Sequence, residues 1–219
     1  MCINADFTGR AMVVPDSGAW VVSPASGVDR LMLDRVGEEV ARATSLVRYA
    51  AGSSFEPHKH ALGEEFLVLE GTFSDEHGDY PIGTYVRNPP GSRHAPFSRD
   101  GCRILVKLRQ IDPADNRAVV IHTADADVWP DTDSDGVSTL PLYEYETEQV
   151  LMKRLGTGCV ASVGDNAGGA ELLVVRGMIE VDGDEMPAES WLRLPPGDTV
   201  TVVATEDSLL WLKTGHLPA

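Results

Sequence analysis

The chain has 219 residues and a formal net charge of −16, because 34 Asp and Glu outnumber 18 Lys and Arg. A surface this acidic repels phosphate backbones, and no basic cluster interrupts it, so we expect no nucleic-acid partner. No run approaches the roughly 18 apolar residues of a membrane helix, and the N-terminus has neither a basic start nor an apolar core, so we expect no membrane segment and no signal peptide.

Short hydrophobic runs alternate with turn signals along the chain, and no long stretch has a helical period. In the first half, four segments are predicted strands because they are rich in β-branched, aromatic and other apolar residues: 43–49, 65–69, 83–87 and 103–108. A Pro-Pro-Gly run and several glycines separate these segments. We therefore predict an all-β sandwich or barrel.

The second half of the chain repeats the first. One such echo could arise by chance, but several in the same order indicate a duplication. We expect a boundary near 112–117, which gives domains at 1–113 and 114–219, although strands exchanged between the halves are an open alternative. The echoes pair Trp20 with Trp129, Gly52 with Gly158, 65–71 with 171–177, 85–91 with 191–197, and 104–108 with 209–213.

The residues suited to chemistry are concentrated between Gly52 and His94. His58 and His60 are two positions apart, so on a strand both side chains leave the same face. Glu64 follows, and the third histidine, His94, comes after a Pro-Gly turn. Three imidazoles and one carboxylate are a ligand set for a divalent metal such as zinc, iron or nickel.

The spacing of this segment has two parts, Gly-x5-His-x-His-x3-Glu-x6-Gly and Gly-x5-Pro-x-Gly-x2-His. Together they resemble the two-part signature of the cupin superfamily, with one departure at Ser98, where an Asn often closes the second part. Residues 58–80 are similar to the cupin domain of ChrR-type anti-sigma factors and of acetylacetone-dioxygenase-like proteins. The resemblance implies a bicupin, with two tandem double-stranded β-helix (jelly-roll) barrels, and a metal bound by His58, His60, Glu64 and His94.

Glu65 is the alternative to Glu64 as the carboxylate ligand. Glu64 has the family spacing, whereas Glu65 recurs as Glu171 in the second half, where the histidines are lost, so a structural role is expected for Glu65. The remaining histidines lie in a hairpin turn or have no partner spacing, and they are expected on the surface: His77, His122 and His216.

None of the four expected ligands recurs in the second half. The second barrel is therefore expected to lack the metal and to have a structural role, packing on the first domain or on another subunit. The positions equivalent to the ligands hold Gly164, Asn166, Ala170 and Val200.

Other polar residues have two readings each. Four polar residues on strands near the site segments either line the pocket, where they would bind an anionic or carbonyl ligand, or form outward salt bridges. Residues 131–136 match the first half of an EF-hand loop, but Leu142 stands where the closing Glu belongs, so an acidic turn is expected. The four strand residues are Arg48, Tyr85, Arg87 and Lys107.

The cysteines, Cys2, Cys102 and Cys159, are odd in number and have no paired spacing. This argues against a disulfide scaffold and is typical of a reducing cytoplasm, where we expect the protein. Cys102 begins an apolar strand, so a buried thiol is expected there.

The first function that the resemblance implies is a metal-binding regulatory or ligand-sensing module. It would hold one divalent ion, zinc first, with iron(II), nickel or manganese as alternatives, and a small molecule in the N-terminal barrel. In ChrR-like proteins a helical zinc-binding domain grips a sigma factor. The sequence begins almost directly with the cupin segment, so sigma-factor binding is not expected. By analogy with other cupins, we expect a homodimer.

The second function is a non-haem iron dioxygenase that acts on a small dicarbonyl-like substrate. Metal coordination positions left open by the protein would admit that substrate. Such enzymes are better known for an all-histidine site, so Glu64 favours the first function. The fold does not decide between the two.

Overall fold

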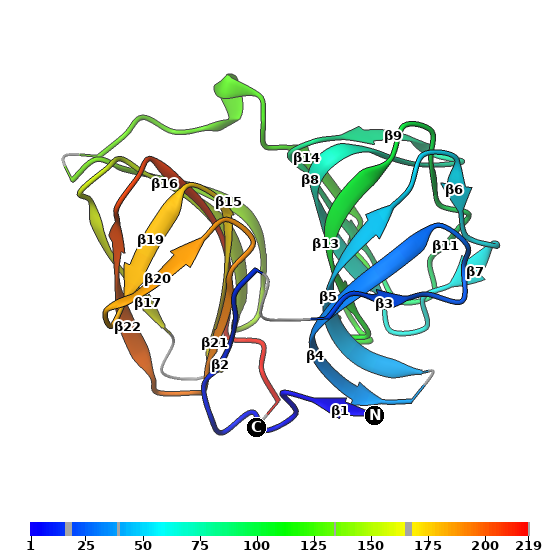
Figure 1. The fold of residues 1–219 in the computed structure, drawn as a ribbon, viewed down its shortest axis with the longest axis horizontal. Helices are drawn as coiled ribbons and strands as arrows, with labels where there is room; N and C mark the ends of the chain where they lie inside the picture. Colours follow the sequence, from blue (N-terminus) through cyan, green and yellow to red (C-terminus); the bar gives the residue numbers. More distant parts are fainter. Residues whose placement is uncertain (16–18, 39, 134, 165–167, 219) are drawn as a thin grey trace. The chain divides into compact units, whose positions relative to one another are not determined.

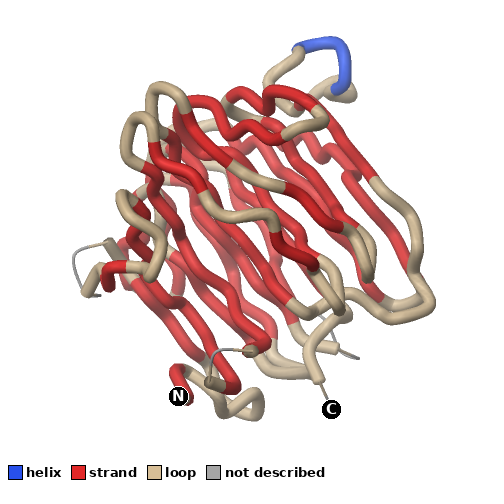
Figure 2. Tube along the Cα trace, turned by 90° about the vertical axis from the view of Figure 1, so that its right-hand side faces the viewer, coloured by secondary structure: helices blue, strands red, loops and turns tan. Residues whose placement is uncertain are grey.

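The protein is described by a computed structural model that places residues 1–15, 19–38, 40–133, 135–164 and 168–218. Nearly all of the regular structure is β-strand, with one 3-10 turn at Ala126–Val128 (Figures 1 and 2). Within these ranges, no helix has the length and apolar character needed to cross a lipid bilayer. The chain divides into two compact units: unit 1 is Met1–Ala5 with Ala19–Asp125, and unit 2 is Asp6–Gly18 with Ala126–Ala219.

Unit 1 is built on an eleven-stranded antiparallel sheet. Its main path is β1 (Cys2–Ile3), β4 (Val28–Gly37), β5 (Ala41–Tyr49), β13 (Cys102–Leu108), β8 (Glu64–Asp75), β10 (Thr84–Asn88) and β14 (Val119–His122). Four short strands branch from this path: β3 (Val21–Val22), β6 (Ser53–Ser54), β9 (Gly78–Pro81) and β12 (Phe97–Ser98). A separate two-stranded sheet pairs β7 (His58–Lys59) with β11 (Arg93–His94).

The core of unit 1 follows the two-residue alternation of its strands. Side chains that share one face of β8 and β13 pack into a single cluster with residues from neighbouring strands. Aromatic rings fill its centre, where the Phe66 and Phe73 centroids lie 4.7 Å apart. The buried members of the cluster are Val28, Val47, Tyr49, Phe66, Val68, Phe73, Val86, Cys102, Ile104 and Val106.

Unit 2 has two antiparallel sheets around an aliphatic core. The six-stranded sheet runs β15 (Val137–Tyr145), β16 (Glu148–Leu155), β23 (Ser208–Thr214), β18 (Ala170–Arg176), β21 (Trp191–Leu194) and β2 (Ala11–Val13). The four-stranded sheet runs β17 (Val160–Gly164), β22 (Thr199–Ala204), β19 (Met178–Val181) and β20 (Asp184–Pro187).

The two units repeat one strand order. The path β4-β5-β13-β8-β10 of unit 1 corresponds to β15-β16-β23-β18-β21 of unit 2. The register agrees as well, because in each unit a central Glu lies opposite an Arg on one neighbouring strand and a Lys on the other. These sets are Glu65 with Arg87 and Lys107, and Glu171 with Arg193 and Lys213. The prediction of an all-β protein with two repeated cupin barrels is confirmed.

The units differ from the ranges 1–113 and 114–219 that the repeat suggested. β14 pairs with β10 and extends unit 1 to Asp125, whereas β2 pairs with β21 and brings Asp6–Gly18 into unit 2. The equivalent strands β10 and β21 therefore each receive one more strand at the same edge of the repeated sheet. In unit 1 this strand is β14, which comes from the end of the unit's own sequence, whereas in unit 2 it is β2, which comes from near the N-terminus of the chain. This pairing answers the open question of strand exchange for β2.

Candidate metal centre

Two short strands of unit 1 present the three histidines. His58 on β7 and His94 on β11 are register partners. His60 follows β7, and its backbone N–H donates to the carbonyl oxygen of Ser92 at 2.9 Å, which continues the extended pairing. The rings of His58 and His60 lie on one side with centroids 4.8 Å apart. The prediction that the His-x-His pair shares a face is confirmed.

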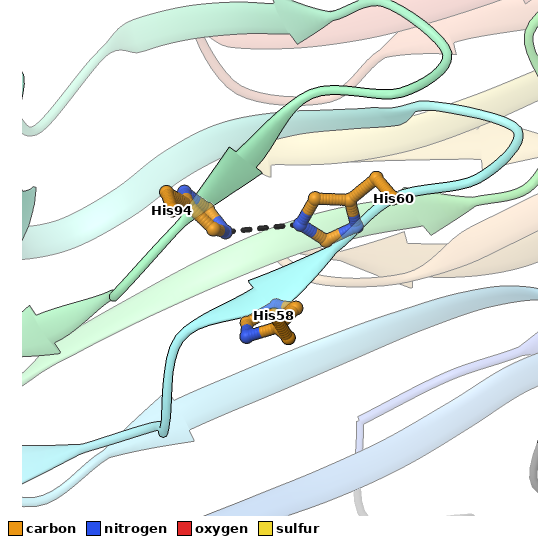
Figure 3. Close-up of side chains that lie close together, drawn as sticks. All are labelled: His58, His60 and His94. Atoms are coloured by element: carbon orange, nitrogen blue, oxygen red, sulfur yellow. Dashed lines mark hydrogen bonds between the residues drawn. The ribbon is translucent and has the colours of Figure 1, made fainter.

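All three imidazoles converge on one point (Figure 3). Nε2 of His60 lies 3.0 Å from Nε2 of His94, and one nitrogen from each ring lies within 4.8 Å of the other two. His60 and His94 are buried, whereas His58 is partly exposed. Within the described ranges, this is the one cluster of His, Cys, Asp or Glu side chains whose geometry suits a metal ion.

Glu64 begins β8 and stands beside this cluster. Its Oε2 lies 3.5 Å from Nε2 of His60 and 3.5 Å from Nε2 of His94. The side-chain amide of Asn88, the register partner of Glu64 on β10, donates to the same oxygen at 3.2 Å. The carboxylate is therefore buried and oriented toward the two buried imidazoles.

Glu65 takes the other role. Adjacent residues of a strand face opposite ways, so Glu65 points away from the histidines. Its Oε2 accepts a hydrogen bond from Nη1 of Arg87 at 3.2 Å, and Nη2 of Arg87 donates to Asp115 at 3.0 Å. All three side chains are almost fully buried. This is a structural ion-pair network on the opposite face of the sheet.

Gly63 explains how the chain turns from the histidines into β8. Its φ of +73° is a conformation that a residue with a side chain seldom adopts, and a Cβ atom there would lie 2.6 Å from Cδ1 of Ile111. Glycine therefore lets the turn close under Ile111 and lets Glu64 follow His60 at short range.

Two hydrogen bonds orient the imidazoles so that the Nε2 atoms of His58 and His94 face the cluster. The ring N–H at Nδ1 of His94 donates to Asp75 at 3.1 Å, and Nδ1 of His58 lies 2.9 Å from the carbonyl oxygen of Glu56, to which it donates. Partners of this kind fix the tautomer and strengthen a histidine as a metal ligand. Asp75 was not identified from the sequence, because the stretch around it indicated only a hairpin turn.

The two buried histidines differ in basicity. Burial lowers the pKa of His60 below its ordinary value, and Glu64 only partly offsets this effect. Burial also acts to lower the pKa of His94, but its hydrogen bond to Asp75 and the charge of Glu64 outweigh burial and raise that pKa. The lowered pKa favours the neutral imidazole of His60, which is the form that binds metal.

The arrangement fits a divalent ion. Two nitrogens that each lie about 2.1 Å from one ion are about 3.0 Å apart at a right angle and about 3.4 Å apart at a tetrahedral angle. The Nε2 atoms of His60 and His94 are 3.0 Å apart, and Oε2 of Glu64 is 3.5 Å from each. A nitrogen-rich set with one carboxylate suits zinc, iron, nickel or manganese.

A cavity of about 80 Å³ opens beside the cluster. His58 and Glu64 line one side of it, and apolar side chains of β5 and β13 line another, including Val47, Ile104 and Val106. A small molecule in this cavity would therefore contact both the metal centre and an apolar wall.

Four polar strand residues were expected either to line the pocket or to form salt bridges: Arg48, Tyr85, Arg87 and Lys107. None of them lines this cavity. Arg87 belongs to the buried network with Glu65, and Tyr85 is fully buried. Nζ of the buried Lys107 donates to Thr44 at 2.9 Å. The remaining residue, Arg48, makes an ion pair at 2.9 Å with Asp29 on the neighbouring strand, so the expected outward salt bridge is found for Arg48, whereas Arg87 and Lys107 are buried and match neither alternative.

The other histidines lie apart from the cluster. His77 and His122 are exposed. The expectation of a surface position is wrong for His216, because its imidazole is almost fully buried and its Nε2 lies 2.9 Å from Oε1 of Glu171. No spacing pattern signals this pair in the sequence, because 45 residues separate its members. Cys102 is buried, and burial raises the pKa of its thiol to about 11.

Unit 2 has no equivalent cluster at its described positions. Ala170 and Val200 are buried in the aliphatic core of unit 2, where the equivalent residues of unit 1 are Glu64 and His94. Gly164 ends β17, and Asn166 lies outside the described residues. In the acidic turn near residue 133, the carboxylate of Asp133 accepts backbone N–H groups at 2.9 and 3.0 Å.

Comparisons with known proteins agree with this fold. Three solved structures align along most of the chain. A Nostoc punctiforme protein proposed to be a dioxygenase is 12% identical and has a TM-score of 0.74, and the alignment covers 96% of this chain and 84% of the Nostoc chain. The Escherichia coli pirin YhhW with nickel(II) is 14% identical, with 96% and 99% coverage and a TM-score of 0.71. A single-residue mutant of salicylate 1,2-dioxygenase from Pseudoaminobacter salicylatoxidans is 11% identical, with 78% and 70% coverage and a TM-score of 0.60.

At these identities the solved structures show the fold alone. No curated protein matches the sequence. The sequence profile of the ChrR cupin-like domain matches the chain twice, at residues 8–112 and 116–218. These two matches cover nearly the whole chain and coincide with its internal repeat, and the protein therefore belongs to the ChrR cupin-like family.

Proposed function

We propose that unit 1 binds one divalent metal ion through His58, His60, Glu64 and His94, and that a small organic molecule binds beside the ion in a ligand-sensing role. The observation that carries this proposal is the cavity next to His58 and Glu64. Four protein ligands would fill a tetrahedral site, whereas a six-coordinate ion such as iron(II), nickel or manganese would keep two positions beside them for a small molecule. The partial exposure of His58 is consistent with an accessible site.

The residues of the chain would divide the work as follows. A metal ion held by the three histidines and Glu64 would supply Lewis acidity toward an oxygen of the ligand. Asp75 holds the proton at Nδ1 of His94, so that Nε2 keeps its lone pair for the ion. Val47, Ile104 and Val106 exclude water from the apolar side of the cavity.

A cobalt-substituted protein tests this proposal directly, because the visible spectrum of cobalt(II) reports on its coordination. We expect the spectrum to change when acetylacetone, a small chelating dicarbonyl, is added, and the His94→Ala protein to show neither the bound cobalt spectrum nor the change. A wild-type spectrum that does not respond to acetylacetone or to other small oxygen donors would contradict an accessible site.

A second candidate function is a non-haem iron dioxygenase. The ligand set suits iron, and two of the proteins with the same fold are described as dioxygenases, one of them by proposal. Oxygen-electrode measurements on the iron(II)-loaded protein distinguish this function from ligand sensing. Substrate-dependent O₂ uptake that is lost in His94→Ala supports an oxygenase, and binding of the same compounds without uptake supports a sensor.

A further inference from the structure

β4 contributes two arginines, Arg30 and Arg35, to the cavity beside the histidines. The residues are five positions apart, so on a regular strand they would face opposite sides of the sheet. A register shift follows Met32, where an extra residue of β4 forms a β-bulge and restores the common face. Arg30 then lies opposite Val47 and Arg35 opposite Ala43, and both of these β5 residues line the cavity.

Neither guanidinium group forms an ion pair with an Asp or Glu side chain within the described part of the chain. Arg30 lies over the ring of Phe55 at 5.8 Å, and Arg35 donates to the backbone oxygen of Glu38. The chain has 34 acidic and 18 basic residues, so carboxylate partners for arginine are abundant. Other arginines are paired with Asp or Glu, among them Arg10, Arg48, Arg87, Arg99 and Arg103.

Two positive charges that face one small cavity repel each other, and an anion bound between them would relieve that repulsion. The carboxylate of Glu64 also lines the cavity, but its Oε2 faces His60 and His94. Burial is the main cause that lowers the pKa of Arg30, Tyr49 acts to raise it, and the nearby charge of Arg35 lowers it further. A carboxylate that accepts hydrogen bonds from a guanidinium forms a short, charge-assisted and often bidentate contact. The cavity therefore presents the donors that such a group needs.

Aromatic contacts place this basic wall near the metal centre. The Phe55 ring, beneath Arg30, lies 5.9 Å from the ring of His58, centroid to centroid. Tyr49 lies 5.8 Å from Phe55 and also lines the cavity. A short molecule can therefore contact Arg30 with one end and face the histidine cluster with the other.

We propose that Arg30 and Arg35 form an anion-binding wall, and that the ligand of unit 1 is a small oxo- or hydroxycarboxylate. Its carboxylate contacts the arginines, and its second oxygen faces the metal centre, so this inference rests on the proposed function. The cavity of about 80 Å³ is smaller than the roughly 150 Å³ that encloses benzene. The buried part of the ligand is therefore limited to a few atoms, with a short apolar group against Val47, Ile104 and Val106.

Titration calorimetry with pyruvate and with pyruvamide tests this inference, because pyruvamide has the same size and the same oxo group but no charge. The protein is metal-loaded wild type, Arg30→Gln, Arg35→Gln and a control, Arg48→Gln, whose side chain is half-exposed and lies outside the cavity. We expect wild type and Arg48→Gln to bind pyruvate alike, and each cavity variant to bind it at least about tenfold more weakly. Pyruvamide should bind weakly and equally to all four proteins.

Equal affinity of wild type and both cavity variants for pyruvate would overturn the inference, as would tighter binding of pyruvamide or no binding of pyruvate to wild type. Arg30→Lys keeps the charge without the planar fork and should bind with intermediate affinity. Thermal unfolding checks that every variant is folded at the temperature of the titrations. If Arg30→Gln does not fold, the pyruvate affinities of Arg35→Gln and Arg30→Lys, compared with that of wild type, test the inference.

The same titrations separate this inference from the proposed function. If the metal centre is wrong and the wall is right, protein without bound metal still prefers pyruvate to pyruvamide, and Arg30→Gln removes that preference. If the wall is wrong and the metal centre is right, the cobalt spectrum still responds to acetylacetone, while pyruvate and pyruvamide bind alike.

Discussion

At the scale of single residues, the two adjacent carboxylates Glu64 and Glu65 have opposite roles. Glu64 faces the imidazoles and Glu65 is paired with a buried arginine. Glu64→Gln should keep the fold and weaken metal binding at least about tenfold, since it removes a charged ligand. Glu65→Gln should lower the free energy of unfolding by about 1.5–3 kcal/mol and leave the metal content unchanged, because Arg87 loses one of its two buried carboxylate partners and keeps Asp115.

Urea denaturation and metal analysis of both proteins measure these effects side by side. If Glu65→Gln lost its metal while Glu64→Gln kept full occupancy, Glu65 would be the metal ligand and Glu64 the structural residue. Spacing indicated which of these two neighbours faces the imidazoles. The burial of Arg87 with Asp115, by contrast, depends on a loop 28 residues away and left no pattern in the sequence.

Asp75 is the residue for which the structure adds most to the metal centre. Asp75→Asn should weaken metal affinity roughly 10- to 100-fold, because Asn is a poorer acceptor for the N–H of His94 and the ring is no longer held as firmly. Asp79→Asn is the matched control on the same hairpin, since Asp79 is exposed and pairs with Arg99 at 3.0 Å. Competition with a metal-binding dye measures both affinities, and equal affinities would show that Asp75 does not orient His94.

At the scale of elements, turns and short strands place the site. Gly63→Ala and Gly52→Ala both put a side chain at a positive φ, +73° and +76°, but only the former adds a clash with Ile111. The backbone cost is about 1–2 kcal/mol for each. Gly63→Ala should lower the unfolding free energy by roughly 1–3 kcal/mol more, because of the clash. Chemical denaturation compares the two, and equal losses would mean that Ile111 yields without cost.

The element scale also shows where sequence patterns are insufficient. The long strands β8 and β13 contain runs of β-branched, aromatic and other apolar residues, and segments of both were predicted. The bulge in β4 reverses the alternation between Arg30 and Arg35, so no periodic rule assigns both to one face. The three-residue strand β2 pairs with β21, some 180 residues later, and so short a segment carries too little pattern to identify its partner.

At the scale of the whole molecule, the repeat separates unit 1, which has the candidate metal centre, from unit 2, which has no equivalent cluster at its described positions. Binding energy of a metal that binds only the folded state adds to stability. Removal of the metal with a chelator should therefore increase hydrogen exchange in β7 and β11, which carry His58 and His94, and leave β18 and β23 of unit 2 unchanged. Mass spectrometry of the exchanged peptides measures this, and equal increases in both units would show that the effect is not local to the site.

The duplication itself was visible in the sequence because glycine and proline positions recur in order, and turn geometry constrains those residues strongly. The loss of the ligands in the second half was visible for the same reason. The extent of each unit could not be predicted from the sequence, since it depends on which sheet edge the short strands β2 and β14 complete.

The metal content of the purified protein tests the central claim most directly. Plasma mass spectrometry of wild type, His60→Ala, His94→Ala and the exposed control His122→Ala should find one divalent ion per chain in wild type and in the control, and almost none in the other two. Two ions per chain, full occupancy in His94→Ala, or no ion in wild type after incubation with zinc, iron(II), nickel and manganese would contradict a single metal centre in unit 1.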